Sequence, residues 1–345
     1  MSRVHRVLHI MYEYGTCGVG GAAAAASRCH HDMLSRGIDS RVICCWVGEC
    51  AEVLGGGVSG RDVLCLRTWW WWMGVRVLHA LTGRWTHAIG LPGFKRVVRR
   101  FGPEEIHIHW MRRDVISWSQ LKWLNSWIQQ KPGAKLFVHL HDLWPLHQKE
   151  IVSLNPTFIV YSDFVANVAS GKRYKTERRE LVLASAFTSR VGREPSCQSI
   201  DGSVKVILFG CKDGRSNPDK GFADLEEALS LLPAMLKSKI VLKIFGETAP
   251  DCVTSGVKTV FLGRINDFTR LRDIYQSATC FAFPSSSETM GMTKLEALAC
   301  GCPVIAFDRM ACAEGVEHKK TGYIARDGDV ADYAEGLKWA LFCGV

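Results

Sequence analysis

Cysteine pairs at metal-ligand spacing are missing from this sequence of 345 residues. Its 14 cysteines are scattered, and nowhere do two of them stand in the C-x-x-C spacing on which many structural zinc sites depend. Cys44 and Cys45 are adjacent, and Cys300 and Cys302 are separated by one residue. We therefore expect free thiols that pack as small hydrophobic side chains, and no structural metal.

Long apolar runs are missing as well. No stretch approaches the roughly 18 uninterrupted apolar residues of a membrane span. The N-terminal "MSRVHRVLHIMYEYG" passes from polar residues directly into a short β-rich run, without the apolar core and cleavage site of a signal peptide. With 47% hydrophobic and 22% charged residues the composition is that of a globular protein, so we expect a cytoplasmic one.

One segment lacks acidic residues. Residues 67–100 contain seven Lys or Arg, no Asp or Glu, and five of the 12 tryptophans, so much of the net charge of +9 lies there. This combination is typical of segments that bind an anionic membrane surface. The alternative is a solvated basic helix whose tryptophans pack inward. The positive electrostatic potential of this segment could also attract a nucleic acid, but we predict no nucleic-acid partner.

Short β-branched runs alternate with longer helical patterns along the chain. The first series of strands is expected at residues 6–11, 40–46, 105–110, 135–140 and 157–161, and the second at 204–210, 239–246, 257–263, 278–284 and 303–308. This rhythm predicts parallel sheets with crossover helices. We predict an α/β protein of two doubly wound, Rossmann-like domains, residues 1–190 and 204–345, facing each other across a ligand-binding cleft.

The stretch "PSSSETMGMTKLEALACGCPV" predicts an anion site. Gly291 should end a loop and let a helix begin near Met292 or Thr293. The first N–H groups of a helix lack intrahelical partners, and the helix dipole is positive there, so this end favours a phosphate.

Two carboxylates border this expected anion site. Glu288 lies in the loop before the helix, and Glu296 follows after seven intervening residues, about one turn into the helix. Carboxylates accept hydrogen bonds from hydroxyl groups. A nucleotide sugar, in which a sugar and a ribose flank a diphosphate, suits this pattern. The alternative is that Glu296 only favours the start of the helix and that Glu288 is solvated.

A cationic loop follows the first strand of the second series. In "FGCKDGRSNPDKGFADL" the side chains of Lys212, Arg215 and Lys220 lie between a strand and a helix, where such sheets bind ligands. They could neutralise a diphosphate, with a bidentate fork from Arg and a point charge from Lys. A solvated loop is the alternative.

Together these motifs resemble a known family. The Glu288 and Glu296 pair, the Arg215 and Lys220 pair before "GF", and "KTGYIA" are similar to motifs of retaining glycosyltransferases of the GT-B fold, family 4. In the first half, "GTCGVGGAAAAASRCHHDMLSRGIDSRV", "IHIHW" and "HLHDLWP" resemble bacterial exopolysaccharide and colanic-acid-type members. The resemblance covers nearly the whole chain.

The resemblance implies roles for residues of the second domain. Glu288 would contact hydroxyls of the transferred sugar and count as catalytic, and Glu296 would contact the ribose. Arg215 and Lys220 would bind the diphosphate. The N–H groups from Gly291 through Met292 to Thr293 would face the sugar and the distal phosphate.

It also implies roles in the first domain. Gly20 and Gly21 would approach the phosphates from that side. His109, as a catalytic residue, and His141, on the acceptor side, would face the reacting sugar or the acceptor. In the front-face mechanism of the family the leaving phosphate takes the acceptor proton, so no metal or other cofactor is expected.

The resulting prediction is a hexosyltransferase of polysaccharide biosynthesis. It would move a sugar from a nucleotide-diphosphate sugar to a lipid-linked glycan, at the inner face of the cytoplasmic membrane. A GT-B binding protein without catalysis is one alternative, although it has no need of two glutamates and two cations. A nicotinamide oxidoreductase using "CGVGGAA" is another, but Glu49 lies about 30 residues from Gly20 and the glutamate pair stays unexplained.

Two H-x-H pairs offer a further alternative. His107 with His109, and His139 with His141, point to one face of neighbouring strands and could form a metal site. We favour satisfied sheet histidines, because no carboxylate or cysteine completes the ligand set.

Overall fold

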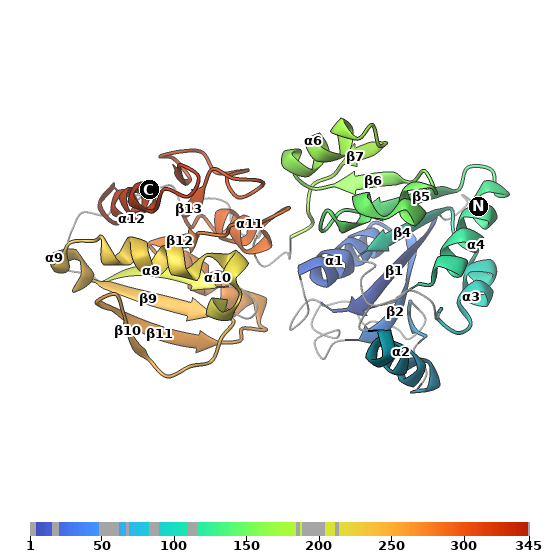
Figure 1. Ribbon diagram of the computed structural model, residues 1–345, viewed down its shortest axis with the longest axis horizontal. Coiled ribbons are helices and arrows are strands. Elements are labelled where there is room, and N and C mark those ends of the chain that lie inside the picture. The colour runs from blue at the N-terminus through green and yellow to red at the C-terminus, as the bar shows by residue number, and fades with distance from the viewer. Residues whose placement is uncertain are drawn as a thin grey trace. The chain divides into compact units, whose positions relative to one another are not determined.

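The structure is a computed structural model that divides into two compact units, Met1–Val182 and Leu183–Val345. It describes residues 5–15, 21–47, 62–66, 69–82, 90–109, 116–183, 187, 204–210 and 214–343. The two units are drawn in Figure 1 and are treated separately below. The division falls before residue 190, where the sequence placed the end of the first domain.

The N-terminal unit is built on a parallel sheet of seven strands in the order β3-β2-β1-β4-β5-β6-β7. In chain order the strands are β1 (Arg6–Tyr14), β2 (Asp39–Val47), β3 (Val63–Cys65), β4 (Glu105–His109), β5 (Lys135–His139), β6 (Thr157–Val160) and β7 (Thr176–Arg178). The order reverses between β1 and β4, which is the switch point of a doubly wound fold. The five predicted strands are confirmed, while the short β3 and β7 were not predicted.

Helices cover this sheet (Figure 1). They are α1 (Gly21–Ser35), α2 (Trp69–Thr82), α3 (Phe94–Phe101), α4 (Trp118–Gln129), α5 (Lys149–Val152) and α6 (Asp163–Gly171), with a 3₁₀ turn η2 (Trp144–His147). Alternate strand residues point to opposite faces. On β1, Leu8 and Ile10 join the large apolar core, while His9 between them points to the other face and is fully buried there.

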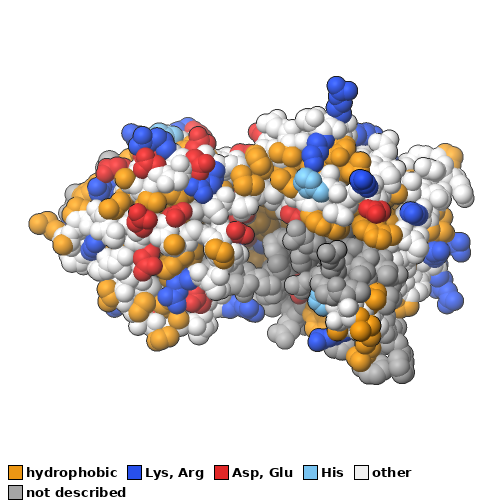
Figure 2. Space-filling model, viewed as in Figure 1, with side chains coloured by type: hydrophobic (Ala, Val, Ile, Leu, Met, Phe, Trp, Pro, Cys, Tyr) orange, Lys and Arg blue, Asp and Glu red, His pale blue; other side chains and the backbone are white. Residues whose placement is uncertain are grey.

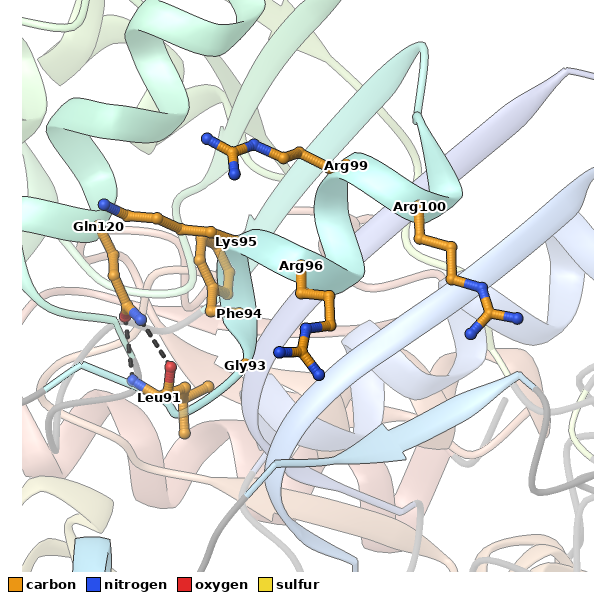
Figure 3. Close-up of a pocket in the computed structure, with 8 residues that line it drawn as sticks. All are labelled: Leu91, Gly93, Phe94, Lys95, Arg96, Arg99, Arg100 and Gln120. Atoms are coloured by element: carbon orange, nitrogen blue, oxygen red, sulfur yellow. Dashed lines mark hydrogen bonds between the residues drawn. The ribbon is translucent and has the colours of Figure 1, made fainter.

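One glutamine side chain ties α4 to the loop before α3. Ser117 and Gln120 form a capping box, in which the Ser117 Oγ accepts from the Gln120 N–H and the Gln120 Oε1 accepts from the Ser117 N–H. The same Oε1 lies 3.0 Å from the Leu91 backbone nitrogen, and Nε2 donates to the Leu91 carbonyl at 2.7 Å (Figure 3). Gln120 is buried, so three backbone groups depend on it.

The C-terminal unit also has a seven-stranded sheet, in the order β10-β11-β9-β8-β12-β13-β14. Its strands are β8 (Lys205–Gly210), β9 (Ile240–Phe245), β10 (Cys252–Thr254), β11 (Val257–Gly263), β12 (Cys280–Phe283), β13 (Val304–Phe307) and β14 (Gly322–Ala325). Only the pairing of β10 with β11 is antiparallel among the pairs of this sheet. The five predicted strands are again confirmed, and the short edge strands β10 and β14 are additional.

Two apolar cores fill the faces of this second sheet. Its helices are α8 (Phe222–Ser230), α9 (Ala234–Lys237), α10 (Phe268–Ser277), α11 (Met292–Ala299) and α12 (Val330–Cys343), and two 3₁₀ turns, η3 (Gly214–Ser216) and η4 (Pro218–Lys220), precede α8. The switch point lies between β8 and β12, whose carboxyl ends lead into η3 and η4 and into α11. Both predicted doubly wound domains are therefore confirmed.

We predict that Gln120→Ala destabilises the N-terminal unit by about 2–4 kcal/mol, because the backbone N–H groups of Leu91 and Ser117 lose their Gln120 acceptor and the Leu91 carbonyl loses its shorter hydrogen bond. All tryptophans except Trp339 lie in this unit, so urea unfolding followed by tryptophan fluorescence reports on it. Gln129→Ala, at an exposed position of the same helix, is the control and should change stability by less than about 0.5 kcal/mol. Equal stability of the two variants would contradict the assignment.

Candidate functional site

The loops that follow β8 and β12 come together at one edge of the second sheet. Because the two strands are parallel neighbours, their carboxyl ends lie side by side. The Lys220 Nζ donates to the Glu288 Oε1 at 2.6 Å, with side-chain exposures of 24% and 13%. The sequence pointed to these two residues in separate motifs, and the fold joins them as an ion pair.

Backbone contacts hold the two loops together. The Ser286 N–H donates to the Asp219 carbonyl at 2.9 Å, and the Ser286 Oγ lies 3.3 Å from the same oxygen. Gly221 has a φ of 70° and caps α8. A Cβ at this glycine would lie 2.0 Å from the Pro284 carbonyl oxygen, so only glycine permits this approach.

Helix α11 begins as the sequence predicted. Gly291 is its N-cap, with a φ of 73°, and Met292 is its first residue. Met292 and Thr293 are half-buried. Their N–H groups and the helix dipole make this end attractive to an anion, and Glu288 lies in the same loop three residues before Gly291.

The second glutamate of the pair is directed into the protein. Glu296 is 5% exposed, and its Oε2 lies 3.5 Å from the Tyr275 hydroxyl of α10. Burial and the nearby Glu296 raise the pKa of Tyr275 well above its usual value. The ribose contact expected of Glu296 stays a prediction.

Arg215 already has a carboxylate partner, Glu247, which the sequence analysis missed. The guanidinium Nη2 donates to the Glu247 Oε1 at 2.7 Å, Nε lies 3.2 Å from both carboxylate oxygens, and the Arg215 backbone N–H donates to Oε2 at 3.1 Å. This bidentate contact lowers the pKa of Glu247 and raises that of Arg215. Glu247 follows β9, the other neighbour of β8, so its place after a strand was the available signal.

A buried lysine beneath the site was also missed. Lys294, in the first turn of α11, is 1% exposed, and its Nζ donates to the Ala311 carbonyl at 2.6 Å. Burial lowers the pKa of Lys294 to about 8, and nearby Cys312, Glu314 and Glu288 oppose that shift.

Residues 207–343 match the family model described as "Glycosyl transferases group 1". This match lies within the C-terminal unit and covers most of it. The sequence is 27% identical over 198 residues to the D-inositol 3-phosphate glycosyltransferase of Rhodococcus erythropolis, which covers 55% of this chain and 42% of that protein. It is 31% identical over 206 residues to the sulfoquinovosyl transferase SQD2 of Arabidopsis thaliana, covering 57% of this chain and 39% of that protein. The chain thus matches about two fifths of each relative's length.

Solved structures resemble the whole chain in fold. Sucrose-phosphate synthase of Thermosynechococcus elongatus has a TM-score of 0.63 at 15% identity, over 99% of this chain and 92% of that one. Anabaena HepE, solved in complex with UDP and glucose, has a TM-score of 0.58 at 17% identity, over 96% and 88%. The predicted GT-B fold of family-4 type is therefore confirmed, with the group 1 domain as its second half.

Three further residues were expected near the phosphates, Gly20, Gly21 and Lys212, and of these the structure describes Gly21. Gly21 is the exposed first residue of α1. Gly20 and Lys212 lie outside the described residues. Their expected roles stay predictions.

The two histidines expected at the acceptor lie in contact. The His109 Nδ1 is 3.1 Å from the His141 Nε2, and the His109 Nε2 is 3.0 Å from the His9 Nδ1. His109 is 1% exposed, so it can contact a substrate only if the neighbouring imidazoles of His9 and His141 move. Burial is the largest cause that lowers the pKa of each of these rings, to about 4 for His141.

The basic segment at residues 67–100 contains α2 and α3. In α3, four cations line a cavity of about 680 Å³ together with Leu91, Gly93, Phe94 and Gln120 (Figure 3); they are Lys95, Arg96, Arg99 and Arg100. Figure 2, drawn from the same side as Figure 1, shows basic side chains at the edge of the N-terminal unit where α3 lies. The side chains of Trp69–Trp72 lie outside what the structure describes. Among the described helices, none has the length and apolarity needed to cross a bilayer.

We predict that Gly221→Ala destabilises the group 1 domain by about 2–4 kcal/mol, because the new Cβ meets the Pro284 backbone. Gly256→Ala is the matched control. It has a φ of +85° but faces only the flexible Lys237 side chain at 3.3 Å, so it should cost only about 1 kcal/mol of backbone strain. Urea unfolding followed by circular dichroism measures both, and equal losses would show that the loop moves away without cost.

Proposed function

We propose that this protein is a retaining glycosyltransferase that takes its sugar from a nucleotide-diphosphate donor. The ion pair of Lys220 with Glu288, beside the start of α11 in a group 1 domain, carries this proposal. The two loops together place Lys220 and the first N–H groups of α11 where they could bind a phosphate, and Glu288 where it could accept hydrogen bonds from sugar hydroxyls. The HepE complex with UDP and glucose supports a donor of this class.

The ion pair itself suggests how the donor is recognised. A diphosphate competes with Glu288 for the Lys220 ammonium, and the carboxylate oxygen released in this exchange can accept a hydrogen bond from a sugar hydroxyl. One event therefore engages both halves of the donor.

Arg215 supplies the second cation for the diphosphate. Its Nε and Nη2 donate hydrogen bonds to Glu247. Because a guanidinium has five donors in a planar fork, its opposite edge can still face a phosphate. Glu247 then acts as a positioning residue, because it fixes the plane of the guanidinium. Removing either side chain should weaken binding of the same phosphate.

The chemical step needs charge stabilisation more than a nucleophile. As the nucleoside diphosphate leaves, negative charge develops on its β-phosphate, which Lys220, Arg215 and the N–H groups of Met292 and Thr293 would stabilise. We propose that this phosphate takes the acceptor proton, so transfer itself requires no metal. Glu288 would orient the sugar.

On the acceptor side we propose a lipid-linked glycan of polysaccharide biosynthesis, reached at the cytoplasmic surface of an anionic membrane. The cations of α3 and the Trp-rich α2 support this, because basic and aromatic residues together favour the lipid headgroup region. The acceptor-side roles of His141 and His109, the ribose contact of Glu296 and the phosphate contacts of Gly20 and Gly21 belong to the same proposal.

We predict that one class among UDP-, GDP- and ADP-sugars raises the melting temperature and is slowly hydrolysed. Lys220→Ala and Glu288→Ala should each weaken this donor by about 10- to 100-fold, since a charged hydrogen bond contributes about 1.5–3 kcal/mol. The partly exposed pair Lys338 and Glu335, 2.8 Å apart on α12, offers matched controls that should bind the donor normally as alanine variants. If a nicotinamide dinucleotide raised the melting temperature and no nucleotide sugar did so, the proposal would be refuted.

We further predict that the protein sediments with anionic but not with neutral liposomes. Changing the four α3 cations, Lys95, Arg96, Arg99 and Arg100, to Gln should weaken this binding about 100- to 1,000-fold, at about 1 kcal/mol per charge. A charge-matched control changes four exposed cations of the other unit, Lys239, Lys258, Arg264 and Arg270. Equal loss in both variants would show attraction by net charge alone, and undiminished binding of the α3 variant would exclude this surface.

A further inference from the structure

Buried histidines line one face of the N-terminal sheet. His9 lies in β1, His107 and His109 in β4, His139 at the end of β5, and His141 two residues beyond it. The first four are at most 1% exposed. Because strand residues alternate between faces, β1, β4 and β5 direct these rings to the same side, opposite the large apolar core.

Three of these rings converge. His109, His139 and His141 each offer a ring nitrogen, and the three nitrogens lie within 4.8 Å of one another. The His109 Nδ1 and the His141 Nε2 are 3.1 Å apart. Two nitrogens bound to one tetrahedral zinc ion at about 2.0–2.1 Å lie about 3.3 Å from each other, so this spacing suits a shared ion.

The carboxylate of Glu105 orients the His139 ring through the imidazole of His107. The Glu105 Oε2 lies 3.3 Å from the His107 Nε2, and the His107 Nδ1 lies 2.7 Å from the His139 Nε2. A carboxylate only accepts, so His107 donates to Glu105 and in turn accepts from the His139 Nε2–H. The lone pair of His139 is then on Nδ1, beside the Tyr161 hydroxyl at 2.5 Å. A metal-ligating histidine usually donates its other N–H directly to a carboxylate, a carbonyl or water, and here the imidazole of His107, held by Glu105, takes that place.

We propose that His109, His139 and His141 hold one divalent transition-metal ion of the zinc class. Three imidazoles select zinc, cobalt, nickel or copper over magnesium and calcium, which prefer oxygen ligands. A fourth position stays open for water or for an oxygen of a ligand. The site lies at the carboxyl ends of β4 and β5, where such sheets bind ligands. This proposal shares His109 and His141 with the acceptor side of the proposed glycosyl transfer, but its test measures metal binding alone.

One of the histidine rings must move before the metal ion can bind. The His109 and His139 rings are stacked, with centroids 3.9 Å apart and planes at 25°. Both can hold the same ion only if one of them turns about its Cβ–Cγ bond. Binding should therefore change the imidazole environment in a way that spectroscopy detects.

The test uses the untagged full chain, treated with a chelator and dialysed. Titration with Zn²⁺ should show one ion per chain by calorimetry and by elemental analysis after dialysis, and Co²⁺ should give the visible absorption of a tetrahedral site. Mg²⁺ should give no signal. Failure of the wild-type chain to bind Zn²⁺ or Co²⁺ more tightly than about 0.1 mM overturns the proposal, whatever the variants do.

Variants then locate the ion. His141→Gln removes a ligand at a half-buried position, and Glu105→Gln removes only the outer carboxylate, so we expect Zn²⁺ affinity to fall at least about tenfold in each. His147→Gln, at an exposed position of the same unit, is the control and should bind as the wild type does. Circular dichroism without metal checks that each variant is folded. Unchanged affinity in both His141→Gln and Glu105→Gln would place the ion elsewhere and overturn the assignment.

Discussion

The close approach of two loops at the switch point between β8 and β12 is the constraint on which the candidate donor site depends. Gly221 must present a bare backbone to the Pro284 carbonyl, since a Cβ would lie 2.0 Å from that oxygen. Only then can Lys220, the residue before it, reach Glu288 at 2.6 Å. The same loop continues to Gly291 and to the first N–H groups of α11. One steric requirement thus places a cation, a carboxylate and a helix terminus within a few residues of each other.

Two of the cations expected to bind phosphate, Lys220 and Arg215, are each paired with a carboxylate in the structure without a donor. Lys220 lies on Glu288, and Arg215 lies on Glu247. Each pair is partly exposed, so its net stabilisation of the fold is small, and exchanging a carboxylate for a phosphate costs little. In the proposed exchange the two carboxylates would behave differently: Glu288 would become available for sugar hydroxyls, while Glu247 would keep the guanidinium plane of Arg215 fixed.

Periodicity was sufficient to predict ten strands and the start of α11, because buried parallel strands are continuous apolar runs and glycine marks a left-handed N-cap. It could not predict the short edge strands β3, β7, β10 and β14, which carry three or four residues and little pattern. Glu247 and Lys294 were missed for a different reason. Their importance comes from neighbours distant in sequence, Arg215 and the Ala311 carbonyl, and only strand order brings these together.

The histidine face shows how far strand order can change an interpretation. In the sequence, two H-x-H pairs lacked a carboxylate, and satisfied sheet histidines were the simpler hypothesis. Pairing of β4 with β5 aligns His109 with His139, and the chain after β5 adds His141 as the third nitrogen. Glu105 enters through His107 rather than as a ligand. Glu105 acts on His139 only through His107, so no sequence spacing reveals it. It nevertheless determines which nitrogen of His139 has its lone pair directed away from His107, and so whether the three imidazoles can bind one ion.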